Sequence, residues 1–200
     1  APRLGDARAD AALAGGLAFL LARPILGALP AAVTLLAAGY LALMATALAA
    51  PAPPVGERAT TARAGGPRGV EPLRIPGPPL GWALPLAIGL AAVAGAGLVA
   101  GPVPDRRVGA AAAALGVLAA VAEEALFRRL LYSRLLRLGT VAAVLGSATV
   151  FALVHLPAYG TAALPVDLGA GLLLSWQRFA SGRWTVPAVT HAVANLLAVT

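Results

Sequence analysis

The sequence contains no cysteine and no lysine, and it is poor in charged and aromatic residues. Of its 200 residues, 12% are charged and 5% are aromatic, whereas 60% are hydrophobic. The absence of cysteine excludes disulfides, thiolate metal sites and cysteine nucleophiles. Since about a quarter of the residues in a soluble domain are charged, this composition is typical of a membrane protein.

Arginine alone carries the positive charge, and its placement argues against a nucleic-acid-binding protein. There are 15 basic and 8 acidic residues. The arginines stand singly or in pairs at the ends of apolar runs, so they indicate membrane topology instead of a basic patch. We therefore expect the lipid bilayer, and no nucleic acid, as a partner. The many Ala, Gly and Pro residues together with the missing Lys suggest a GC-rich bacterial genome, and hence a multi-pass protein of a bacterial cell membrane.

Seven apolar segments have about the length of a membrane helix. A spanning helix needs about 20 mostly apolar residues. The first segment is weak because Arg23 and Pro24 interrupt it. The sequence predicts an all-α fold, a polytopic transmembrane bundle of about six to seven membrane helices. The candidate segments are 9–29, 30–50, 80–101, 108–137, 140–157, 163–178 and 184–200.

A proline-rich stretch divides the chain. Residues 51–79 contain eight prolines, five glycines, four arginines and two glutamates. This composition can neither propagate a helix nor build a core. We expect N-terminal membrane helices in residues 1–50, a polar loop over 51–79, and further membrane helices over 80–200.

Glycines inside the expected helices indicate where two helices approach closely. Small residues let the backbones of membrane helices pack together. We expect this role for Gly95, Gly97, Gly169 and Gly171.

Three short polar blocks lie inside apolar runs, where a bilayer disfavours them. They are Glu123-Glu124-Ala-Leu-Phe-Arg128, Phe151-Ala-Leu-Val-His155 and His191-Ala-Val-Ala-Asn195. A charged side chain at mid-membrane costs about 2.5–3.5 kcal/mol even on the lenient insertion scale, so such residues usually face a protein interior and have a function. Together, the three blocks supply two carboxylates, a guanidinium, two imidazoles and a carboxamide on three helices. These are the functional groups from which an active site is built.

The three blocks are predicted to lie at a similar depth. If the N-terminus, the 51–79 loop, the helix end near Arg137 and the turn at 178–183 share one side, that side carries twelve of the fifteen arginines and is cytoplasmic by the positive-inside rule. Along their helices, Glu123 and His155 then lie about 21 and 24 Å from this side, and the third block lies about 12 to 18 Å from it. Within a hydrocarbon layer of about 30 Å, all three blocks share a middle region.

The spacing within each block places its polar groups on one helix face. Glu124 and Arg128 are four residues apart and can form an ion pair, and the other two blocks have the same spacing. Glu123 is turned by about 100° from Glu124, so the two carboxylates cannot do the same job. One can hold the arginine while the other faces the cavity. Glu123 has no obvious cation of its own.

These residues resemble the motifs of the CPBP family of intramembrane proteases. The pattern EExxxR, then FxxxH, then HxxxN fills every position of the three motifs, and the region of similarity is about residues 108–200. The family comprises CAAX prenyl endopeptidases and bacterial relatives, some of which are tied to bacteriocin processing or self-immunity. The resemblance implies hydrolysis of a peptide bond inside or near the membrane.

The resemblance also implies a role for each motif residue. Glu123 would be the general base that activates a water, and His155 would orient or polarise that water. His191 and Asn195 would donate hydrogen bonds to the oxyanion of the tetrahedral intermediate. The ion pair of the first motif would fix its helix. The implied catalytic residues are Glu123, Glu124, Arg128, His155, His191 and Asn195.

Structural readings of the same residues remain open. The Glu124–Arg128 pair suits a purely structural role as well as a catalytic one. Taken singly, His155 suits a satisfied core histidine, and His191 and Asn195 suit interhelical hydrogen bonding. Their joint occurrence favours the active site.

A zinc site is a second possibility for the same side chains. Glu123, His155 and His191 would make a His2Glu ligand set with an open position for water. The HExxH motif is absent, however, and the ligands would come from three separate helices. We therefore favour glutamate chemistry without a metal or other cofactor, with zinc as the alternative.

Three classes of function are compatible with the motifs. The favoured one is an intramembrane endopeptidase acting on a membrane-embedded or lipid-anchored peptide. Since bacteria generally lack protein prenylation, a bacterial membrane peptide is the expected substrate. The alternatives are a non-catalytic membrane scaffold or bacteriocin self-immunity protein of the same fold, and a small proton-coupled transporter, since carboxylates and histidines also form proton relays.

Overall fold

The predicted all-α fold is confirmed by a computed structural model, which describes residues 4–51, 81–100 and 109–198. Every regular element within these residues is a helix. The loop predicted over 51–79 lies outside the described residues, except for Pro51.

The described residues form seven helical rods, one for each predicted segment. The fourth rod is continuous from residue 110 to residue 138, although its hydrogen-bonding pattern changes along its length. The elements are α1 (Leu4–Gly27), α2 (Ala32–Ala49), α3 (Ala83–Ala100), α4 (Ala110–Glu124), the π-helix η2 (Ala125–Leu131), α5 (Tyr132–Leu135), η3 (Leu136–Leu138), α6 (Thr140–Tyr159), η4 (Thr161–Ala163), α7 (Leu164–Ser181) and α8 (Thr185–Leu197).

Four of these rods are long and apolar enough to cross a bilayer. They are α1, α2, the rod over 110–138 and α6, with mean hydropathies of 1.5 to 1.9. Two further helices, α3 and α8, are apolar but shorter. By length and composition, four of the predicted membrane helices therefore qualify as spans in the part of the chain that is described.

The predicted weakness of the first segment is wrong, because α1 continues through Arg23 and Pro24 to Gly27. A proline inside a helix removes one hydrogen bond and crowds the carbonyl four residues earlier. The cost is limited here because only one turn of α1 follows Pro24. Membrane helices tolerate proline where neighbouring groups satisfy the freed backbone.

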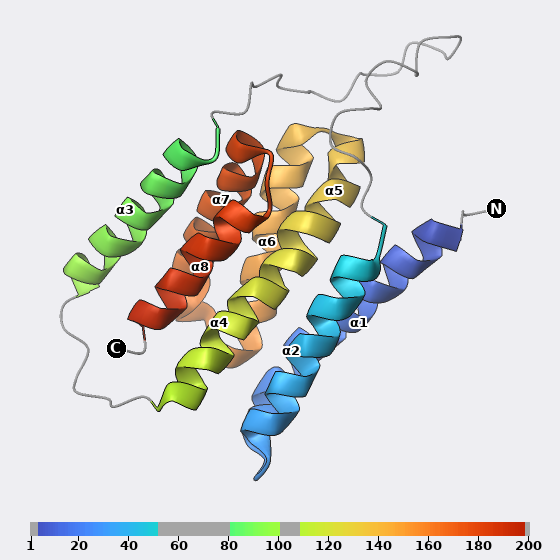
Figure 1. Ribbon diagram of the computed structural model, residues 1–200, viewed down its shortest axis with the longest axis vertical. Coiled ribbons are helices and arrows are strands. Elements are labelled where there is room, and N and C mark those ends of the chain that lie inside the picture. Colours follow the sequence, from blue (N-terminus) through green and yellow to red (C-terminus); the bar gives the residue numbers. More distant parts are fainter. Residues whose placement is uncertain (1–3, 52–80, 101–108, 199–200) are drawn as a thin grey trace.

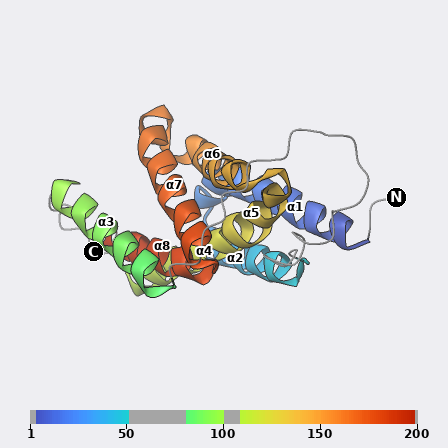
Figure 2. The same ribbon diagram turned by 90° about the horizontal axis from the view of Figure 1, so that it is seen from above.

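The rod containing α4 lies at the centre of the bundle (Figure 1). It packs against α2 on one side and against α8 on the other. The α1–α2 pair covers one flank, where α1 also contacts α6, and α3 covers the opposite flank by packing on α8 and α7. Figure 2 shows α3 and α1 at opposite ends of the molecule, with α4 between them.

Ion pairs connect the start of α1 to the end of the central rod. The Asp6 carboxylate lies 2.8 Å from Arg134 Nη1 and 3.0 Å from Arg137 Nη2. In Figure 1, the end of α2, the start of α3 and the α7–α8 turn lie toward the same end of the bundle as α5. This is the arrangement that the arginine distribution assumes.

The π-helix η2 interrupts the central rod directly after the two glutamates. Two side chains from other helices bind its backbone carbonyls: Ser147 Oγ donates to Phe127 O at 3.1 Å, and Arg178 Nε donates to Arg128 O at 3.0 Å. Single π-helical turns inside α-helices occur frequently at functional sites. Here the π-helix sets the direction of Arg128 relative to the glutamates.

Only one of the four glycines predicted to mediate close packing does so. A Cβ atom added at Gly171 would lie 2.9 Å from Ala148 O and 3.0 Å from Ala148 Cα, so α6 and α7 touch backbone to backbone there. No atom lies within 4 Å of the corresponding position at Gly95, Gly97 or Gly169. The prediction is wrong for these three, because helical periodicity turns them away from the neighbouring helices.

We expect Gly171→Ala to destabilise the bundle. The added methyl group would push α7 away from the Ala148 backbone, and overpacking of this kind typically costs about 1–3 kcal/mol. Thermal unfolding in detergent, followed by circular dichroism, measures the effect. Gly169→Ala on the same helix is the matched control and should not lower the unfolding midpoint. Equal destabilisation by the two variants would contradict the close contact.

Candidate active site

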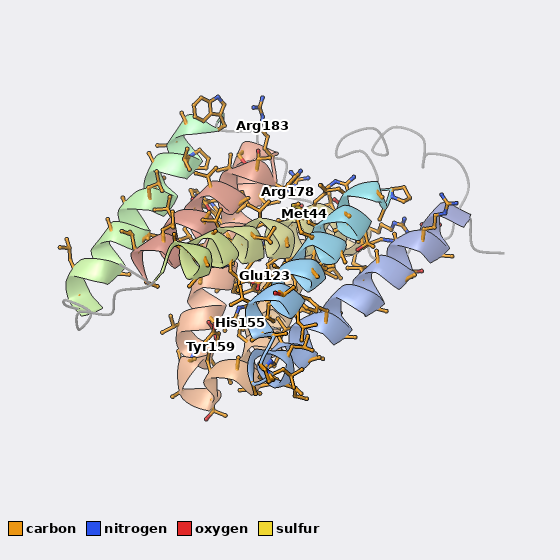
Figure 3. The ribbon with its side chains drawn as sticks, turned by 60° about the horizontal axis from the view of Figure 1, so that its bottom comes forward. Met44, Glu123, His155, Tyr159, Arg178 and Arg183 are labelled. Carbon is orange, nitrogen blue, oxygen red and sulfur yellow. The ribbon has the colours of Figure 1, made fainter. Side chains whose placement is uncertain are left out.

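The three polar blocks come together inside the bundle. Glu123 and Glu124 end α4, Arg128 lies in η2, His155 lies in α6, and His191 lies in α8. All five side chains are buried, with exposures from 0% for Glu124 and Arg128 to 9% for His191. Figure 3 shows Glu123 and His155 near one another. The blocks therefore meet, as the depth estimate predicts.

Glu124 and Arg128 form the predicted ion pair, and two further helices join it. Arg128 Nη1 lies 2.9 Å from Glu124 Oε1, and Arg128 Nη2 donates to Gly171 O at 3.1 Å. His191 Nδ1 lies 3.0 Å from the same Glu124 oxygen. One carboxylate and one guanidinium thus connect the central rod to α7 and α8.

Phe151 of the second motif packs at the centre of this network. The Arg128 guanidinium lies 4.5 Å from the centroid of the Phe151 ring, a cation–π contact. The same ring contacts the rings of Phe127, His155 and His191 at 5.4, 4.4 and 5.7 Å between centroids. Phe151 therefore fixes the two histidines relative to the arginine and closes the space around them with apolar surface.

The two oxygens of Glu123 have different surroundings. Glu123 Oε1 lies 2.8 Å from Arg23 Nη1, whereas Oε2 is buried and has no hydrogen-bond partner among the described residues. His155 Nε2 lies 3.6 Å from Glu123 Oε2, which is too long for a hydrogen bond. His155 Nδ1 lies 2.7 Å from the Phe151 carbonyl oxygen, so Nδ1 carries the proton. In a neutral imidazole, Nε2 is then an acceptor that faces Glu123 Oε2.

Arg23 is the cation that the sequence prediction for Glu123 lacked. It reaches the site from α1, 100 positions away in the chain, so no local spacing reveals the pair. Arg23 Nη1 also lies 3.4 Å from Tyr40 OH, and the guanidinium lies 5.6 Å from the centroid of the Tyr159 ring. The available signal was the cost of a charge inside an apolar helix, which applies to Arg23 as it does to the glutamates.

The two side chains that the resemblance assigns to the oxyanion are already engaged. His191 Nδ1 donates to Glu124, so Nε2 of a neutral His191 is an acceptor and can donate only in the imidazolium form. Asn195 Nδ2 donates to Gly116 O at 2.9 Å, which connects α8 to α4. Asn195 thus lies one turn beyond His191, bound to the backbone of α4.

The side chains proposed for zinc do not form one ligand set. Glu123 and His155 face each other, but His191 binds Glu124 instead of Glu123. In the described part of the chain, no group of three or more His, Cys, Asp or Glu side chains is placed to hold a metal ion. The arrangement therefore does not fit the three-ligand site that the sequence offered as an alternative.

Residues 107–197 match the family model described as type II CAAX prenyl endopeptidase, Rce1-like. No curated protein and no solved structure matches the chain. The match contains the central rod, α6, α7 and α8, and with them all three motifs. It contains neither α1 nor Arg23.

Proposed function

Because residues 107–197 belong to the type II CAAX prenyl endopeptidase Rce1-like family, we propose that this integral membrane protein is an intramembrane endopeptidase that uses glutamate-activated water. The substrate would be a membrane-embedded or lipid-anchored peptide. We place the protein as a multi-pass component of a bacterial cell membrane, on the basis of its apolar helices and its arginine-only positive charge.

The observation that carries this proposal is the pair of facing acceptors, Glu123 Oε2 and His155 Nε2. Two acceptors 3.6 Å apart cannot bind each other, but one water can donate a hydrogen bond to each of them. Such a water has both hydrogens engaged and presents an oxygen lone pair to a substrate. A general base must lie within hydrogen-bond reach of the proton that it removes, and Glu123 Oε2 meets this condition.

The proposed reaction conserves atoms and charge. The water oxygen attacks the carbonyl carbon, one water proton moves to Glu123 Oε2, and the carbonyl π electrons move to the oxygen to give a tetrahedral oxyanion. Collapse of this intermediate breaks the C–N bond, and Glu123 returns its proton to the leaving nitrogen. Phe151 and the Glu124–Arg128 pair hold the helices that carry the reacting groups.

We propose that no metal takes part. The support is the separation of the candidate ligands into two contacts, Glu123 with His155 and Glu124 with His191. Arg23 also occupies one oxygen of Glu123, and a bound cation would have to displace or repel it.

We expect the detergent-purified protein to cleave members of a panel of transmembrane peptides and farnesylated peptides ending in the CAAX pattern. The cleavage rate should not change when a zinc chelator is added, because Glu123 and His155 suffice to activate water. Mass spectrometry of the products and metal analysis of the protein check this expectation. If the protein contains stoichiometric zinc, and a chelator removes the zinc and the activity together, the metal-free mechanism is contradicted and a metal-dependent one is supported.

The alternative function is a non-catalytic scaffold or bacteriocin self-immunity protein with the same fold. The closed state of the site favours it, since Glu123 is 2% exposed and already bound to Arg23. The same panel separates the two functions. Absence of cleavage by a well-folded wild type over the whole panel would support the scaffold.

A further inference from the structure

The guanidinium of Arg23 combines a fixed position with an unused donor. Nη1 is held by Glu123 Oε1 at 2.8 Å and lies 3.4 Å from Tyr40 OH. Nη2 is buried and has no hydrogen-bond partner among the described residues. A buried N–H group without a partner has lost its hydrogen bonds to water without replacement, and the loss is greater for a charged group, so Arg23 Nη2 calls for an explanation.

The contact between Arg23 and Glu123 is one-sided. A paired arginine and carboxylate commonly form two parallel hydrogen bonds. Here only Nη1 and Oε1 meet, and both Arg23 Nη2 and Glu123 Oε2 are left without partners. The pair therefore leaves one donor group, Arg23 Nη2, and one acceptor, Glu123 Oε2, free on two neighbouring side chains.

The proposed reaction requires a hydrogen-bond donor near the carbonyl oxygen of the scissile bond. Charge develops on the carbonyl oxygen as water adds to the carbon, and fixed donors around that oxygen lower the barrier. In the described structure, His191 donates its Nδ1 hydrogen to Glu124, and Asn195 donates one of its two amide hydrogens to Gly116 O, which ties its side chain to the backbone of α4. The Nη2 group of Arg23 has both hydrogens free and a permanent positive charge.

We propose that Arg23 is a catalytic residue whose Nη2 group donates hydrogen bonds to the carbonyl oxygen of the scissile bond and to the oxyanion formed from it. This inference rests on the proposed peptidase function. As the water oxygen bonds to carbon and its proton moves to Glu123 Oε2, the electron pair released from the C=O double bond settles on the oxygen held by Nη2. The N-terminal helix α1, outside the family-matching segment, then completes the active site.

Arg23→Lys tests this role, because lysine keeps the charge next to Glu123 but offers no second donor group in a fixed plane. We expect kcat for the best peptide of the panel to fall on the order of 10²-fold, as when one oxyanion donor is lost. KM and the thermal unfolding midpoint should stay near the wild-type values. Millimolar guanidinium should partly restore kcat in Arg23→Ala, which a merely structural arginine would not show.

Arg134→Lys is the matched control, because Arg134 also binds helix α1, but through Asp6 and Asp10 near its start, at the opposite end from Arg23. It should cleave at the wild-type rate. A wild-type kcat in Arg23→Lys would overturn the proposal. An increased kcat would overturn it as well, because it would show that Arg23 restrains Glu123 instead of assisting the reaction. Loss of fold in Arg23→Lys would also overturn it, since the ion pair would then be the whole role. If the wild type cleaves nothing, the peptidase function itself fails, and this proposal fails with it.

Discussion

Glu123→Gln abolishes peptide cleavage and leaves the helix bundle folded: this is the result we expect from the strongest test of the mechanism. Glutamine has nearly the shape of glutamate, and its amide oxygen can still accept the hydrogen bond from Arg23 Nη1. It cannot take a proton from water. General-base catalysis contributes about 10²–10⁴-fold, so we expect a fall in kcat on the order of 10³-fold or more.

The measurement is the initial cleavage rate in detergent, together with circular dichroism and thermal unfolding of the same preparation. Asp10→Asn is the control, because Asp10 is an exposed carboxylate of α1 that pairs with Arg134. It should retain wild-type activity. A Glu123→Gln variant with unchanged kcat would remove the glutamate from the mechanism.

Arg128→Met prevents the bundle from folding stably, whereas the neighbouring Arg129→Met is tolerated: this is the largest effect that we expect on stability. Arg128 is fully buried, and its loss leaves the Glu124 carboxylate uncompensated in the interior. Removal of one partner of a buried ion pair costs about 3–5 kcal/mol. Arg129 is only partly buried and donates to the carbonyls of Ala47 and Ala50 at the end of α2.

A double variant distinguishes the ion pair from simple packing. Glu124→Gln combined with Arg128→Met removes both charges, and should be more stable than Arg128→Met alone because no unpaired charge remains. Thermal unfolding midpoints of the two single variants and the double variant give the coupling energy. Additive losses would contradict an ion pair and assign the stability to the contacts of the Arg128 side chain with Phe151 and Gly171.

Sequence patterns predicted the helices and the local geometry of the first motif. Apolar runs located all seven rods, since each must satisfy its own backbone hydrogen bonds. The spacing of four residues predicted the contact of Glu124 with Arg128, and the turn of about 100° predicted that Glu123 faces elsewhere.

Contacts between distant helices were not accessible in the same way. The pairing of Arg23 with Glu123 depends on how α1 packs against α6 and the central rod, which no periodicity records. The hydrogen-bond state of His191 likewise depends on which acceptor its Nδ1 meets, and that acceptor lies 67 positions away. The glycine prediction failed at three of its four positions for the same reason, because a small residue in a helix does not reveal which face meets a neighbour.

The burial of the proposed catalytic pair also affects the rate of turnover. With Glu123 and His155 exposed by 2% and 6%, a peptide backbone reaches the reacting oxygen only after surrounding side chains have moved apart. Collective helix movements take microseconds to milliseconds, and opening steps limit kcat in many enzymes. The proposed reaction therefore requires an opening of the bundle in each cycle, and we expect the rate of that opening to depend on helix packing and on the surrounding lipid. On this mechanism, bilayer thickness and fluidity would help to set the rate, alongside the acid–base chemistry of the site.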